Sequence, residues 1–254
     1  MRKTLKVREL EIGTNSPKII VPIVGKHHKE ILEKAESLQG MQIDVVEWRA
    51  DFYEEIDSIE RTLALLTALR SALGDIPLLF TFRTEKEGGQ RGISMADYTA
   101  LNIAVAESGQ VDLIDVEIFS GDDVVMENIR AIHGAGVLVV GSNHDFHATP
   151  PKDELVRRLR KMQDMGADMP KIAVMPTCAA DVLTLLAATN EMHERYADRP
   201  IITMSMSPQG VISRLAGEVF GSAMTFGAVG QTSAPGQISV DELAQTLDIL
   251  HKAM

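Results

Sequence analysis

The chain has 254 residues, of which 45% are hydrophobic and 24% are charged, and its formal net charge is −11. This composition excludes disordered and fibrous proteins and supplies enough apolar residues for a full core, so we expect a single domain over residues 1–254. The acidic balance argues against nucleic-acid and membrane partners, because both require clustered Lys and Arg.

Cysteine usage and hydropathy indicate where the protein works. Cys178 is the only cysteine, so the sequence offers neither a disulfide framework nor a cysteine-based metal site. No apolar run reaches membrane-spanning length, and the start Met-Arg-Lys-Thr lacks the apolar core of a signal peptide. These features predict a cytoplasmic protein.

Residues 1–16 contain two short alternating runs, at residues 4–7 and 9–12, which predict a β-hairpin. Eight β-branched runs follow, and each precedes a helical stretch; we expect strands at residues 19–24, 45–49, 78–83, 113–118, 137–140, 171–176, 201–206 and 224–229. Apolar residues at helical spacing predict helices over residues 59–73 and 179–196. Helix starts are indicated by the spacing of Ser94 with Asp97 and of Ser239 with Glu242, and by Pro150.

Strands that alternate with helices over a whole chain predict an α/β fold with a parallel sheet. Eight such units in about 230 residues favour a closed (β/α)8 TIM barrel over an open, doubly wound sheet. The first strand is not followed by a Gly-x-Gly-x-x-Gly turn, which supports the barrel. The N-terminal hairpin is then expected to close the bottom of the barrel.

Charged residues gather where the predicted strands end, which is the side on which barrels carry their active sites. The period of two places Glu47, Arg49 and Asp51 on one face of the second strand, and Thr81 with Arg83 on one face of the third. A structural ion pair between Glu47 and Arg49 is the simpler interpretation of those two residues alone.

The run from Ser142 to His147 closes the fifth predicted strand and supplies imidazoles, while residues 85–89 supply carboxylates. His144 and His147 are three residues apart, as metal ligands can be. No further histidine, cysteine or acidic cluster completes such a site, so the sequence does not favour a metal.

Lys171 is the only lysine inside the eight predicted strands. A buried ammonium is costly unless it is neutralised or used, so this lysine is a candidate amine nucleophile. The alternative is a solvated lysine at the bottom rim, because Lys171 stands at the start of its predicted strand. Its long side chain, with the small Ala173 as the next inward neighbour, can nevertheless reach the interior. Together with a histidine, carboxylates and arginines, it predicts imine chemistry on an anionic carbonyl compound.

Six motifs resemble the type I 3-dehydroquinate dehydratase family, in order and over essentially the whole chain. They are Glu47-Trp48-Arg49, Thr81-Phe82-Arg83 with Glu87-Gly88-Gly89, Ser142-Asn143-His144-Asp145-Phe146-His147, Pro170-Lys171-Ile172-Ala173, Gly210-Val211-Ile212-Ser213-Arg214 and Ser233-Ala234-Pro235-Gly236-Gln237. One departure is Pro22, which stands where the family pattern carries serine.

The resemblance implies dehydration of 3-dehydroquinate to 3-dehydroshikimate in the shikimate pathway, through a Schiff base and without metal or cofactor. It implies that Lys171 forms the imine, that His144 is the general acid and base, and that Glu87 orients the histidine. It also implies a homodimer and a set of substrate-binding residues: Glu47, Arg49 and Arg83 at the mouth, Arg214 on the substrate carboxylate, Ser233 and Gln237 on a closing loop, and Met204, Met206 and Phe226 as an apolar wall.

Two rival functions use the same features. A class I aldolase also places an imine-forming lysine on the sixth strand, but sugar-phosphate aldolases need a glycine-rich anion loop after strands seven and eight, and Gly210 and Gly227 do not form one. A non-catalytic barrel that merely holds an anion is the other rival. Borohydride trapping separates an imine enzyme from a binder. The sequence leaves open whether the reaction serves biosynthesis or quinate breakdown.

Overall fold

Strands and helices alternate along the chain. The computed structural model describes residues 4–230 and 236–254. The strands are β1 (Leu5–Val7), β2 (Leu10–Ile12), β3 (Lys18–Ile23), β4 (Val45–Arg49), β5 (Leu78–Thr81), β6 (Leu113–Glu117), β7 (Leu138–Asp145), β8 (Met169–Val174), β9 (Ile202–Ser205) and β10 (Met224–Phe226). The helices are α1 (His28–Ser37), α2 (Ile59–Leu73), α3 (Met95–Glu107), α4 (Asp122–Gly134), α5 (Lys152–Asp164), α6 (Ala179–Glu191), α7 (Val211–Leu215), α8 (Gly217–Phe220) and α9 (Val240–Ala253).

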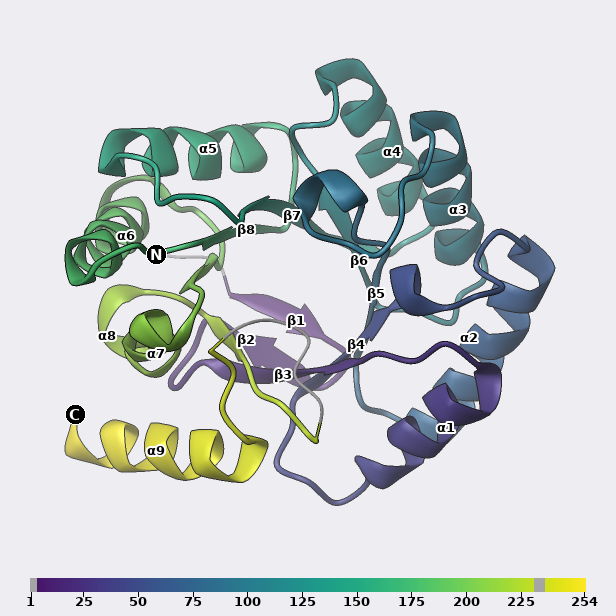
Figure 1. The fold of residues 1–254 in the computed structure, drawn as a ribbon, viewed down its shortest axis with the longest axis horizontal. Helices are drawn as coiled ribbons and strands as arrows, with labels where there is room; N and C mark the ends of the chain where they lie inside the picture. Colours follow the sequence, from purple (N-terminus) through teal and green to yellow (C-terminus); the bar gives the residue numbers. More distant parts are fainter. Residues whose placement is uncertain (1–3, 231–235) are drawn as a thin grey trace.

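Within the described residues, β3 to β10 form one eight-stranded parallel sheet in the order β10-β3-β4-β5-β6-β7-β8-β9. Its two edges meet at a seam, where Ile201 and Ser222 form a parallel bridge and the Ala223 N–H donates to the Ile201 carbonyl at 2.8 Å. The sheet is thereby closed into a barrel with helices around it (Figure 1). The predicted (β/α)8 TIM barrel is confirmed.

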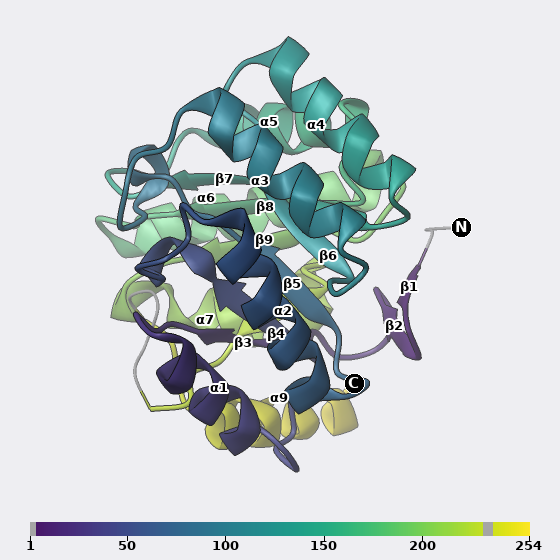
Figure 2. The ribbon, with the colours of Figure 1, turned by 90° about the vertical axis from the view of Figure 1, so that its right-hand side faces the viewer.

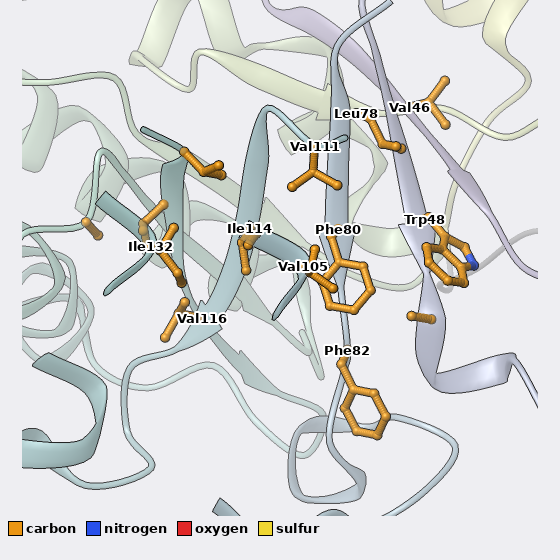
Figure 3. Close-up of a cluster of buried hydrophobic side chains, with 14 of the residues drawn as sticks. Val46, Trp48, Leu78, Phe80, Phe82, Val105, Val111, Ile114, Val116 and Ile132 are labelled. Atoms are coloured by element: carbon orange, nitrogen blue, oxygen red, sulfur yellow. The ribbon is translucent and has the colours of Figure 1, made fainter. Parts of the chain in front are cut away.

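The core has two layers, because each strand is covered on both faces. Between the sheet and the helices, side chains such as Trp48, Phe80 and Ile114 pack against apolar helix residues (Figure 3). Inside the barrel, a second cluster includes Ile20 and Met169. Both-sided burial explains why the strands read as nearly continuous apolar runs in the sequence.

The predicted N-terminal hairpin is present as the antiparallel pair β1 and β2. Val7 and Ile12 are buried in the cluster inside the barrel. The Arg8 guanidinium lies 2.7 Å from Asp112, directly before β6, so the hairpin covers the N-terminal ends of the strands. In Figure 2 it stands at one end of the barrel, outside the ring of helices.

The structure corrects several predicted boundaries. β7 runs on to Asp145, so Asn143 and His144 belong to the strand and do not follow it; their pairing with Ile172 and Ala173 of β8 extends the ladder. β8 begins two residues before Lys171. Helix α5 begins at Lys152 rather than beside Pro150, and the predicted helix 179–196 ends in a π-helical turn, Met192–Tyr196.

Other local predictions are confirmed. The helix predicted over residues 59–73 is α2. Ser94 and Ser239 are N-caps that accept from the N–H groups of Asp97 and Glu242. None of the helices in the described part of the chain is both long enough and apolar enough to span a membrane.

Candidate active site

A cavity opens between the C-terminal ends of the strands. Its lining includes every site residue expected from the sequence except Ser233, which lies outside the described residues: Glu47, Arg49, Arg83, Glu87, His144, Lys171, Met204, Met206, Arg214, Phe226 and Gln237. These residues come from six of the eight barrel strands or the segments directly after them, so the barrel brings together positions that are far apart in the sequence.

Lys171 is the third residue of β8 and is only 3% exposed. Its Nζ atom lies 3.1 Å from Oδ2 of Asp115 and 3.8 Å from Oε1 of Glu47, and it sits 4.8 Å from the centre of the Phe226 ring. The lysine is therefore inside the cavity and not at the solvated bottom rim. Two carboxylates hold the ammonium that burial alone would make costly.

His144 and Glu87 form a hydrogen-bonded pair on the cavity wall. Nδ1 of His144 lies 2.9 Å from Oε2 of Glu87, and the His144 backbone N–H donates to the same oxygen at 2.9 Å. Asn143 Nδ2 donates to the other carboxylate oxygen at 3.1 Å. An ionised Glu87 fixes the tautomer with the proton on Nδ1, which leaves Nε2 as the basic nitrogen.

Burial governs the charge of this pair. Desolvation lowers the pKa of His144 well below 6.5, and the cationic Arg83, Lys171 and Arg49 lower it further. Desolvation raises the pKa of Glu87 to about 8, although Arg83 and the hydrogen bond from Asn143 oppose the rise. The lowered pKa of His144 favours a neutral imidazole. Its Nε2 atom accepts a proton while Glu87 is ionised, and the raised pKa of Glu87 shifts that ionised form to higher pH.

Arg83, which was expected at the mouth of the barrel, lies deeper inside it and is only 3% exposed. Its guanidinium is 2.8 Å from Asp115, 2.9 Å from Glu117 and 3.0 Å from Ser142 Oγ. Sequence reasoning missed the two acids, although their signal was present: in the run Leu-Ile-Asp-Val-Glu the period of two turns both toward the interior. Asp115 is fully buried and Glu117 is 1% exposed.

Arg49 and Glu47 do not pair with each other as the simpler interpretation had it. The Arg49 guanidinium makes two hydrogen bonds of 2.8 Å to Asp51, and Glu47 accepts from Thr81 Oγ1 at 2.9 Å. The three residues predicted to share a face therefore make two separate sets of contacts: Arg49 with Asp51, and Glu47 with Thr81. Asp51 no longer belongs to the strand, because it lies in the short 3-10 helix Ala50–Phe52.

Arg214, in α7, is 1% exposed, and its Nη1 atom lies 3.9 Å from the sulfur of Met204. Burial lowers the pKa of Arg214 to about 10, which leaves it cationic at neutral pH. Met204, Met206 and Phe226 are buried apolar walls of the cavity. The cavity thus presents a cation beside an apolar surface.

Two lining residues, Gly88 and Phe146, were not expected from the sequence. Gly88 has φ +85, and a Cβ atom there would lie 2.3 Å from the Phe146 ring. Phe146 in turn lies nearly parallel to the His144 ring, at 22° and 6.5 Å between centres. Glycine therefore allows Phe146 to pack against the loop that carries Glu87.

The remaining residues noted in the sequence lie elsewhere. His147 is exposed, and within residues 4–230 and 236–254 no group of three or more His, Cys, Asp and Glu side chains is arranged to hold a metal ion. Pro22 is buried in β3, where it borders a smaller cavity on the side of α1 and not the site of Lys171.

Comparison with known proteins gives a consistent result. The family model described as type I 3-dehydroquinase matches residues 19–254. The 3-dehydroquinate dehydratases of Clostridioides difficile and Bacillus licheniformis are both 54% identical to this chain, over 100% and 99% of each sequence respectively. A crystal structure of the Clostridium difficile type I enzyme with covalently modified comenic acid superimposes with a TM-score of 0.98 at 54% identity, and covers all of both chains. The chain therefore belongs to the type I 3-dehydroquinase family, whose members are lyases that act on 3-dehydroquinate.

Proposed function

We propose that this chain dehydrates 3-dehydroquinate to 3-dehydroshikimate through an imine on Lys171, with His144 as the general acid and base. The observation that carries the proposal is the burial of Lys171 in this cavity, beside a hydrogen-bonded pair of His144 and Glu87. A buried amine that faces a cavity is suited to carbonyl attack. A neutral imidazole on the wall of the same cavity is suited to proton transfer.

The reaction follows from the roles of these groups. The neutral amine of Lys171 adds to the substrate carbonyl, water leaves, and the protonated imine withdraws electrons from the neighbouring carbon. His144 removes a proton from that carbon and then protonates the departing hydroxyl group. Arg214 pairs with the substrate carboxylate through a planar guanidinium, which fixes orientation as well as charge. Glu47 and Arg49 contact substrate hydroxyls at the mouth, with Arg83, Ser233 and Gln237 completing the set and Met204, Met206 and Phe226 excluding water.

The surroundings of Lys171 bear on this mechanism. Two carboxylates, those of Asp115 and Glu47, lie within ion-pair distance of Nζ. The amine that attacks a carbonyl is the neutral form, so Nζ gives up a proton before the carbon–nitrogen bond forms.

A solved relative supports the proposal of covalent chemistry. The Clostridium difficile enzyme, 54% identical over the full length of both chains, was crystallised with a covalently modified comenic acid. A cytoplasmic homodimer goes with the proposal, as in the resemblance set out above.

Borohydride reduction tests the proposal directly. In the presence of 3-dehydroquinate or its product, reduction is expected to inactivate the enzyme and to add the mass of the ligand to Lys171, as read by peptide mapping. The enone product gives an absorbance rise that reports turnover in the same sample. Lys171→Met is the matched control, because it keeps the length of the side chain but cannot form an imine.

The outcomes separate the rivals. Label on Lys26 or Lys86, or no label, overturns the assignment, and binding without label or enone indicates a non-catalytic barrel. An imine without enone points to an aldolase.

A further inference from the structure

Asp115 lies directly beneath Lys171 and is held on three sides. Its Oδ2 atom is 3.1 Å from Nζ of Lys171 and 2.8 Å from Nη2 of Arg83, and its Oδ1 atom accepts from Ser142 Oγ at 2.6 Å. The residue is fully buried in β6. A carboxylate held in this way is a fixed charge and not a mobile side chain.

Asp115 remains ionised despite its burial. Desolvation by itself would raise the pKa of Asp115, but Arg83, Lys171 and the hydrogen bond from Ser142 lower it overall. An acid with a lowered pKa is a poor proton acceptor. Asp115 is thus unsuited to take the proton of the lysine and suited to face a cation throughout the reaction.

The proposed imine keeps a cation at this position. Overall, the ammonium of Lys171 and the carbonyl give the protonated imine and water: two of the three ammonium protons leave with the carbonyl oxygen, and the nitrogen retains one N–H and the positive charge. The charge that replaces the ammonium therefore arises at the same atom, Nζ, next to the same carboxylate. The proton on carbon goes to His144, so Asp115 neither gains nor loses one.

We propose, building on the imine function assigned above, that Asp115 is the counter-ion of the protonated imine: it accepts the hydrogen bond from the imine N–H and keeps that nitrogen protonated while the neighbouring carbon is deprotonated. The protonated imine is the form that withdraws electrons, so this contact sets how long the electron sink persists. Glu47 is less suited to the role, because it lies farther away at 3.8 Å and already accepts from Thr81.

Other titratable groups face the same atoms and set the baseline for a test. Glu117 lies on the same strand, β6, and the others come from neighbouring elements: Glu47 of β4, Arg83 after β5, Glu87 of the 3-10 helix Glu85–Glu87, Tyr98 of α3 and His144 of β7. Glu117 offers a matched control. It is also a buried acid of β6 bound to Arg83, but no contact joins it to Lys171.

The test compares Asp115→Asn with Glu117→Gln. Cyanoborohydride reduces protonated imines and hardly touches neutral ones, so the pH at which trapping of the 3-dehydroquinate adduct falls by half reports protonation of the imine nitrogen. Removal of the Asp115 charge is expected to move this alkaline limit down by about one pH unit or more, a tenfold loss of proton affinity. In Glu117→Gln the limit is expected to stay close to the wild-type pH, even where total turnover falls.

Three outcomes are distinguishable. If wild-type enzyme gives no adduct, the imine function itself fails. If it gives an adduct and both variants keep the wild-type limit, or shift equally, Asp115 is a structural acid and the counter-ion assignment is overturned.

A measurement on wild-type enzyme covers the case in which Asp115→Asn does not fold. The C=N stretch of the unreduced imine complex is expected to move to lower frequency in deuterium oxide, as only a protonated imine does; a C=N stretch that does not move overturns the proposal.

Discussion

His144 illustrates how burial prepares a single side chain for its work. Its side chain is 10% exposed, and three cations act on it through a region from which water is largely excluded. These effects shift the imidazole toward its neutral form, whereas an exposed histidine is half protonated near about pH 6.5. The acid limit of this base is therefore expected to lie below the pH at which an exposed histidine titrates.

Replacement of His144 by alanine should therefore lower turnover by about a hundred- to ten-thousand-fold, the range for a positioned acid and base, while imine trapping on Lys171 persists. The base acts when unprotonated, and a lowered pKa keeps it unprotonated as the pH falls. The acid limb of kcat/KM in wild-type enzyme should thus lie below about pH 6.5. Steady-state rates over a pH series check both points.

His147→Ala is the matched control, because His147 is exposed and three residues away; it should keep near-normal turnover. If the His144 variant turned over as fast as the His147 variant, His144 would have no part in the chemistry.

Among the structural elements, the seam between β9 and β10 depends on one side chain. Ser222 Oγ accepts from the buried N–H of Thr203 at 3.0 Å and lies within hydrogen-bond distance of the carbonyl oxygens of Thr203 and Met224. The backbone ladder is thin here, with one parallel bridge at Ile201. The hydroxyl therefore replaces part of the ladder that the other strand pairs have.

Ser222→Ala should lower the free energy of unfolding by about 1–3 kcal/mol, the range for a buried donor left without its acceptor. Chemical denaturation measures the change. Ser71→Ala, on an exposed position of α2, should stay within about 0.5 kcal/mol of the wild type. Equal stability of the two variants would show that the seam does not need the hydroxyl.

The strands and helices differ in how far the sequence determines them. Strands such as β4 and β6 follow from β-branched runs, and the start of α3 follows from the Ser94 cap, because both signals are local. The extension of β7 through His144 does not follow from a local signal, since it depends on pairing with β8. Asp115 was passed over for a similar reason: an acid in a strand gives no local sign that an arginine 32 positions earlier, Arg83, will neutralise it.

At the scale of the whole molecule, the hairpin and the cavity occupy opposite ends of the barrel. Ile12 is fully buried at the bottom, whereas Lys171 and His144 face the cavity at the other end. Stability and chemistry are thereby separated in space, as is general for this fold. A change in the hairpin should therefore alter the stability of the protein and leave its chemistry unchanged.

Ile12→Ala should lower the free energy of unfolding by about 2–5 kcal/mol, because it leaves a cavity under the barrel, while kcat of the folded enzyme stays unchanged. Thermal or denaturant unfolding with parallel assays checks this. Ile249→Ala removes the same atoms from a position on α9 that is 59% exposed, and should cost much less. Similar losses from both variants would mean that the hairpin does not seal the interior.

The seal has a consequence for the traffic of water. In the described part of the chain, the hairpin side chains fill the lower end of the barrel, so the interior opens only at the other end, where the cavity lies. The proposed cycle releases water when the imine forms, releases it again at dehydration, and takes it up when the imine is hydrolysed. In all three steps water must pass through the same opening as the ligand. A ligand bound at this opening blocks the passage of water. The order in which product and water leave and enter therefore becomes part of the turnover.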